Sequence, residues 1–180
     1  MDFYTALKYT QKETDISGGM MGTEPELDKA AEDLLVDIFG YETRALDLDN
    51  KGQRYYSKRN YAQAKQFFEC SLEIRERALG PDHPDVARSL YHLGLLYKTQ
   101  RDYSQAEPFY KRSLAIREKA LGPDHPDVVT SLNSLAVLYD NQGDYAQAEP
   151  LYKRSLAIRE KALGPDHPDV ATSLHNLAGL

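Results

Sequence analysis

The sequence predicts an all-α protein built as an α-solenoid, a stack of antiparallel helix hairpins. The heptapeptide Gly-Pro-Asp-His-Pro-Asp-Val occurs three times, at 80–86, 122–128 and 164–170, with a period of 42 residues. Residues 86–127 and 128–169 share about 31 identities in 42. Apolar residues recur at helical spacing within each unit. A fixed period of this size is typical of stacked-repeat solenoids.

The second unit shows how the residues specify a hairpin. Pro84 suits the first turn of a helix, and Asp82 or His83 can cap the free amides there. A second helix is expected from about 104 to 121, and Gly122 supplies its left-handed terminus. The apolar positions that support the two helices are Val86, Leu90, Leu93, Leu96 and Tyr97 in the first, and Ala106, Phe109, Tyr110, Leu114, Ile116 and Leu121 in the second.

The period also predicts how the chain is divided. Thr23 and Pro25 indicate a helix start, and apolar residues then recur at helical spacing until Gly40, which is expected to end this helix. The expected segments are a weakly ordered leader (1–22), an N-terminal capping helix or degenerate repeat helix (23–40), three hairpin units (41–83, 84–125 and 126–167) and the first helix of a truncated fourth unit (168–180).

The last unit stops at Leu180, in the middle of a hairpin. Repeat arrays normally end on a helix with a polar outer face. Two interpretations stay open. The chain is a fragment of a longer array, or its last helix is exposed and self-associates.

The hairpin pattern resembles the tetratricopeptide repeat (TPR). The matching residues are Leu90, Leu93, Gly94, Tyr97, Ala106, Tyr110 and Ser113, with their equivalents in the third unit. An ordinary TPR has 34 residues, and the longer period here is similar to that of kinesin light chains and many bacterial repeat proteins. The first unit departs from the pattern because Lys51 replaces a leucine, which predicts a less buried side. The resemblance implies a right-handed solenoid whose first helices line a concave groove.

Composition narrows the class of partner. The net charge is −6, and residues 1–43 hold ten acidic against three basic residues, which leaves the repeats almost neutral. Such an array does not attract nucleic acid phosphates. No apolar run is long enough to span a membrane. The single cysteine, Cys70, and the lack of a visible signal peptide favour a cytoplasmic location.

No catalytic or metal-binding arrangement is evident, so we expect neither enzyme activity nor a cofactor. His83, His125 and His167 occupy identical contexts, but neighbouring helices pack 8–10 Å apart, too far for these histidines to share one metal ion. Capping and loop packing explain them better. Cys70 stands where the other units have Arg112 and Arg154, and is expected near the surface.

The TPR resemblance also implies which residues face a ligand. We call them the predicted groove set: Leu46, Asp49, Asn50, Gln53 and Tyr56 in the first unit; Arg88, Tyr91, His92, Leu95 and Lys98 in the second; Thr130, Asn133, Ser134, Val137, Asp140 and Asn141 in the third; and Thr172, His175 and Asn176 in the fourth. They vary between units while the framework repeats. The alternative is that they are solvated positions under little constraint.

These features favour a protein–protein interaction scaffold that binds a peptide segment of a partner in the groove. Arg88, His92 and Lys98 suggest a preference for acidic segments, whereas the basic clamp that grips chaperone C-termini in some TPR domains is missing. Two alternatives remain: a kinesin-light-chain-like cargo adaptor, and the regulatory or sensor part of a larger signalling ATPase or protease.

Overall fold

The computed structural model describes residues 24–180, with side chains from residue 40 onward; the predicted leader, 1–22, lies outside the described residues. The described residues form seven helices and no strand. The helices are α2 (Glu24–Ser57), α3 (Tyr61–Leu79), α4 (Pro84–Thr99), α5 (Tyr103–Leu121), α6 (Pro126–Asn141), α7 (Tyr145–Leu163) and α8 (Pro168–Ala178).

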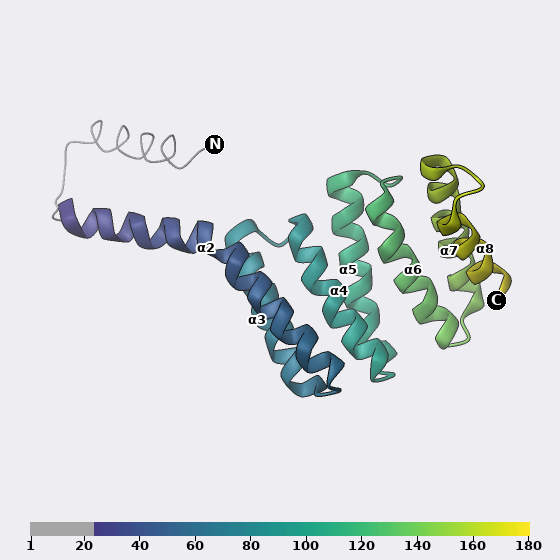
Figure 1. Cartoon of the computed structure of the whole chain (residues 1–180), viewed down its shortest axis with the longest axis horizontal. Coiled ribbons are helices and arrows are strands. Elements are labelled where there is room, and N and C mark those ends of the chain that lie inside the picture. Colours follow the sequence, from purple (N-terminus) through teal and green to yellow (C-terminus); the bar gives the residue numbers. More distant parts are fainter. Residues whose placement is uncertain (1–23) are drawn as a thin grey trace. The chain divides into compact units, whose positions relative to one another are not determined.

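Residues 39–180 form a stack of helix hairpins (Figure 1). Helix α4 pairs with α5, and α6 pairs with α7. The second helix of each hairpin also packs against the first helix of the next, so that α3 contacts α4, α5 contacts α6 and α7 contacts α8. The predicted all-α repeat solenoid is therefore confirmed.

The expected helix end at Gly40 is wrong, because α2 continues through this residue to Ser57. A glycine inside a helix costs about 1 kcal/mol relative to alanine but does not stop the helix. The three glycines that end the helices before the heptapeptide loops, such as Gly80, are each followed by proline, whereas Gly40 is followed by Tyr41. The capping role proposed for residues 23–40 stays a prediction, since their side chains lie outside the described residues.

Each heptapeptide loop starts a helix with its histidine. His83, His125 and His167 are the N-caps of α4, α6 and α8, and the Nδ1 atom of each accepts a hydrogen bond from the backbone N–H two residues later. The helix before each loop ends at a glycine with positive φ, between 85° and 91°. The sequence prediction that these histidines cap helices is thus confirmed.

The same loops are held by the following hairpin. Arg112 on α5 donates to the carbonyl oxygen of Pro81 at 3.0 Å, and Lys119 reaches Asp82 at 2.5 Å. Arg154 and Lys161 on α7 repeat both contacts with the next loop, at Pro123 and Asp124. In the first unit, Cys70 stands in place of this arginine and is exposed. The repeated loop therefore both begins a helix and anchors its neighbour.

The turn between the two helices of a hairpin needs one residue with positive φ. Gly143 fills this place in the third unit with φ 75°, but Arg59 and Arg101 fill it in the first two with φ 58° and 62°. A side chain in this left-handed region costs roughly 1–2 kcal/mol. The first two turns are therefore strained relative to the third.

Replacement of Arg101 by glycine is expected to raise the free energy of unfolding by about 0.5–1 kcal/mol, because the relief of strain exceeds the entropy that glycine adds to the unfolded chain. The matched control, Gly143→Ala, is expected to lower it by about 1 kcal/mol, because its Cβ would meet no other atom within 4 Å and only the backbone would be strained. Urea unfolding of the three proteins measures both changes, and a less stable Arg101→Gly variant would contradict this account of the turn.

Candidate functional site

The predicted groove set lies on α2, α4, α6 and α8, with widely different exposure. The exposed members are Leu46, Asn50, Gln53, Thr130, Asn141, Thr172 and His175. The half-buried ones are Tyr56, Arg88, Tyr91, His92, Leu95, Lys98, Asn133, Ser134, Val137, Asp140 and Asn176. Asp49 alone in the set is buried, with 4% of its surface exposed. That these residues bind a peptide stays a prediction, and Asp49 is not placed to touch one.

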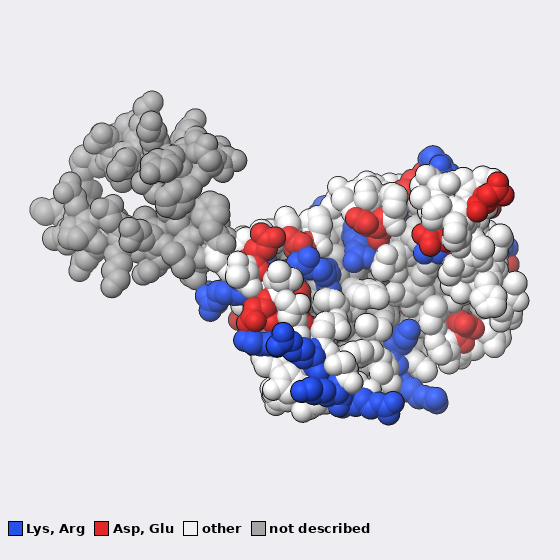
Figure 2. Space-filling view, viewed as in Figure 1, with Lys and Arg blue, Asp and Glu red and all other residues white. Residues whose placement is uncertain are grey.

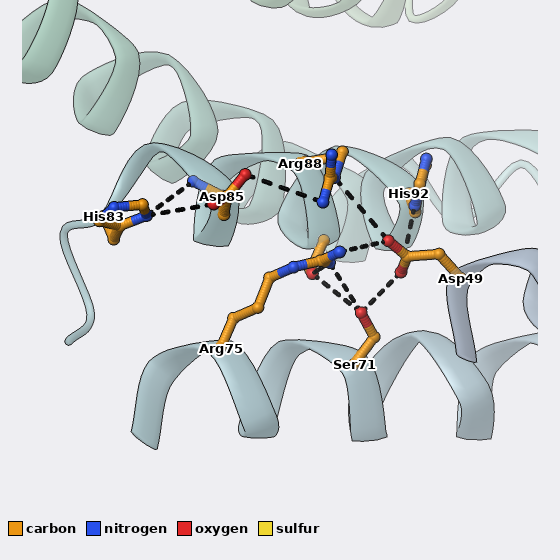
Figure 3. Close-up of polar contacts among 8 residues, drawn as sticks. Asp49, Ser71, Arg75, His83, Asp85, Arg88 and His92 are labelled. Carbon is orange, nitrogen blue, oxygen red and sulfur yellow. Dashed lines mark hydrogen bonds and ion pairs between the residues drawn. The ribbon is translucent and has the colours of Figure 1, made fainter. Parts of the chain in front are cut away.

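Asp49 is instead the centre of a buried polar network (Figure 3). Its Oδ2 lies 2.7 Å from Nη2 of Arg75, and Ser71 Oγ donates to its Oδ1 at 2.6 Å. Arg75 is 1% exposed and also donates through Nη1 to the hydroxyl groups of Ser71 and Ser89. One carboxylate thus ties α2, α3 and α4 together.

Two other members of the predicted groove set turn toward the same carboxylate. Arg88 Nε lies 3.8 Å from Asp49 Oδ2, and His92 Nδ1 lies 3.7 Å from Asp49 Oδ1 (Figure 3). Arg88 also pairs with Asp85 at 3.7 Å. Of the three basic residues predicted to attract an acidic segment, these two therefore already face acids, while Lys98 has no acid partner among the described residues.

The network keeps Asp49 ionised. Burial by itself raises the pKa of this carboxyl, but the contacts with His92, Arg75 and Ser71 and the charge of Arg75 outweigh it and lower the pKa to about 2. The pKa of Lys98 is lowered because the side chain is partly removed from water.

The position of Asp49 recurs every 42 residues with a different side chain. In the second unit it is Tyr91, whose ring lies 6.0 Å from the guanidinium carbon of Arg117, the equivalent of Arg75. In the third it is Asn133, whose buried Oδ1 accepts no hydrogen bond from the described residues. The side chain at this position therefore changes from a carboxylate bonded to Arg75, to an aromatic ring beside Arg117, to an amide whose oxygen has no hydrogen-bond partner among the described residues.

The arginines themselves make the same contact in every unit. Arg75, Arg117 and Arg159 each donate to a serine on the next first helix, namely Ser89, Ser131 and Ser173. Sequence reasoning missed these arginines as inter-repeat contacts. The available signal was a cation repeated at 42-residue intervals, four residues after the buried serines of the second helices.

Other candidate sites are weaker. Among residues 40–180, no group of three or more His, Cys, Asp or Glu side chains is placed to hold a metal ion. No helix in the described part of the chain is both long and apolar enough to cross a membrane.

Leu174 on α8 is 48% exposed, whereas the equivalent Leu90 and Leu132 are buried. Self-association through α8 stays a prediction.

Stacked hairpins with small residues at their contacts define a solenoid of the TPR class. At Gly52 and Gly94 an added Cβ would lie 2.4 and 2.7 Å from the rings of Phe68 and Tyr110, so the helices of a hairpin approach closely. A family model described as the nephrocystin-3 TPR domain matches residues 47–162. The chain therefore belongs to this family of TPR domains.

Solved structures agree with this assignment. BtubC (BKLC) from P. vanneervenii has a TM-score of 0.69 and 25% identity, over 75% of this chain and 54% of that chain. A putative kinesin light chain from Podosopora anserina, with nearly identical TPR-like repeats, has a TM-score of 0.68 and 26% identity, over 76% and 64%. The likeness to TPR repeats of the kinesin light chain type is confirmed.

A more distant structure shows the fold alone. The N-terminal domain of stress-induced protein-1 from C. elegans has a TM-score of 0.57 and 12% identity, over 77% of this chain and 97% of that domain. A comparison with curated proteins finds no match. The chain spans 54% and 64% of the lengths of BtubC and the putative kinesin light chain. TPR folds are in general non-catalytic scaffolds for protein–protein interaction.

The network around Asp49 gives a prediction about stability. Asp49→Asn is expected to lower the free energy of unfolding at pH 7 by about 3 kcal/mol, because it leaves the buried guanidinium of Arg75 without its counter-charge. The control Asp47→Asn removes only an exposed pair with Lys51 and is expected to cost less than about 0.5 kcal/mol.

The pH dependence gives a second readout of the same variant. Because the pKa of Asp49 is lower in the folded than in the unfolded chain, its stabilisation is complete above about pH 4 and is lost as the pH falls toward 2. The stability gap between wild type and Asp49→Asn should therefore narrow over this range in urea titrations. A gap that is absent at pH 7, or that widens on acidification, would contradict the assignment.

Proposed function

We propose that the chain is a non-catalytic scaffold that binds a peptide segment of a partner protein along α2, α4, α6 and α8. The observation that carries this proposal is the contrast between the two helices of the second and third hairpins. Helices α5 and α7 differ at only two of nineteen positions, 104/146 and 109/151. The predicted groove set, in contrast, changes from unit to unit in size, polarity and charge. A repeat protein whose first helices bind a ligand and whose second helices only support them is expected to vary in the first helices and to repeat in the second.

The clearest change of charge lies at one repeated position, which is Tyr56, Lys98 and Asp140 in successive units. Lys98 is half-buried and without an acid partner among the described residues, and Asp140 is likewise half-buried. A bound segment would therefore meet a cation in the second unit and an anion in the third. We propose a partner segment with an acidic residue near Lys98 and a basic or neutral residue near Asp140.

A cargo-adaptor role is the second candidate. It is favoured by the likeness to a putative kinesin light chain. A regulatory or sensor portion of a larger signalling protein is the third. Both roles use the same peptide-binding surface, and they differ in what the surface is joined to.

The double variant Lys98→Asp with Asp140→Lys tests the surface, because it keeps the net charge and places at each position a residue that the repeat already accepts there. Partners retained by the full-length chain are identified, the shortest binding peptide is mapped, and its Kd is measured by calorimetry. We expect the Kd to rise at least about tenfold, and a peptide with its charges exchanged to recover most of the affinity.

A matched control exchanges charges on the second helices. Lys111→Glu with Glu149→Lys changes exposed or half-exposed residues of α5 and α7 and also keeps the net charge. Its Kd should stay within about twofold of wild type, since it lies outside the predicted groove set. Equal losses in the two double variants, or none in the first, would refute a groove made by the first helices.

A further inference from the structure

The first hairpin presents a charged face where the later hairpins are apolar. Leu93 and Leu96 on α4 are 1% and 0% exposed, because α3 of the preceding hairpin covers them. The equivalent residues of α2, 42 positions earlier, are Lys51 and Arg54. One turn further along, Lys58 takes the place of Gln100. A helix that packed here as α3 packs on α4 would have to place carboxylates, not apolar side chains, against these cations.

Beneath these cations lies an aromatic pair that is covered in the next unit. Tyr97 stacks on Phe109 with ring centroids 5.6 Å apart, and both rings pack against the cluster that includes Ala64 and Phe68 of α3. The ammonium group of Lys65, also on α3, lies 5.4 Å from the Tyr97 ring. A helix thus covers the aromatic pair of the second unit.

The first unit has the same stack, without such a cover among residues 40–180. Tyr55 and Phe67 stack with centroids 5.3 Å apart. Together with Lys51, Arg54 and Lys58 they line a surface hollow of about 360 Å³. Figure 2 shows Lys and Arg side chains gathered over the C-terminal half of α2 and the turn after it. The only ion pair of the three lining cations within the described residues is between Lys51 and Asp47, at 2.6 Å.

A polar face is expected at the end of a repeat array, but either sign of charge would keep it soluble. Here three cations line one hollow of a chain whose net charge is −6. The aromatic pair at the same place offers apolar area that a merely solvated face does not need. The combination matches a ligand that carries both carboxylates and apolar side chains.

We infer that the hollow formed by Lys51, Arg54, Tyr55, Lys58 and Phe67 binds an acidic amphipathic helix of a partner protein. The helix takes the place that α3 takes on α4. Its apolar residues cover the Tyr55–Phe67 stack, and its carboxylates pair with Lys51, Arg54 and Lys58. This surface is separate from the predicted groove set and does not depend on the groove.

The chain supplies a template for the probe. A capped peptide of α3, Tyr61–Leu79, is made with Lys65→Leu, because Lys65 covers the position equivalent to Tyr55, and with Phe68→Glu, because Phe68 covers the positions equivalent to Lys51 and Arg54. Its neutral twin has Leu at 65 and Gln at 68. Calorimetry with the full-length chain at low salt should show at least about tenfold tighter binding of the acidic peptide, with a difference that shrinks as salt is added.

Two protein variants localise the effect. Lys51→Glu with Arg54→Glu should remove the preference for the acidic peptide, whereas Lys111→Glu with Lys153→Glu on α5 and α7, an equal change in charge at exposed sites, should retain it. Circular dichroism checks that each variant is folded. The inference would be overturned if the two peptides bound equally, if the acidic peptide did not bind, or if the two variants had equal effects. Sedimentation equilibrium that shows a dimer lost in Lys51→Glu with Arg54→Glu would also overturn it, in favour of a second copy as the occupant.

Discussion

The contact between the second helix of one hairpin and the first helix of the next is the interaction on which the whole array depends. A single hairpin cannot bury its own apolar face, so each unit relies on its neighbour. In every unit this contact combines apolar packing with one arginine that crosses to a serine, as Arg117 does to Ser131 at 2.9 Å. Buried serines on both helices let the backbones approach and leave room for the guanidinium group.

This contact also explains why the heptapeptide repeats almost without change. Its glycine ends one helix, its histidine caps the next, and its first proline and aspartate are held by the arginine and lysine of the following hairpin. A substitution at any of these places would disturb two units at once. The predicted groove set varies between units instead, and Asp49 alone in this set is buried.

Much of the fold follows from local chemistry that the sequence displays. The helix starts at Pro84, Pro126 and Pro168 and the histidine caps were predictable, because each depends on neighbouring residues only. The continuation of α2 through Gly40 was not, since an isolated glycine is tolerated inside a helix and is by itself an ambiguous stop signal. The burial of Asp49 was hidden for another reason: its position looks variable and polar, and only the fold brings Arg75 and Ser71 to it.

The candidate site was also predictable only in part. The repeat register shows that Arg88 and His92 belong to the first helix of the second unit, but it cannot show that both side chains face Asp49. One substitution in the sequence, Lys51 for leucine, indicated the charged outer face of the first unit. Its meaning depends on Tyr55 and Phe67 lying beneath it, which requires the three-dimensional packing.

The most direct test of the central contact is equilibrium unfolding of Arg117→Gln, followed by hydrogen exchange of the individual helices. If the arginine couples the second and third hairpins, the variant should lose about 1–2 kcal/mol at this contact. Its unfolding transition should broaden, and amides of α6–α8 should exchange before those of α4 and α5. A single transition with unchanged midpoint and slope, and protection that falls equally in all helices, would contradict the account.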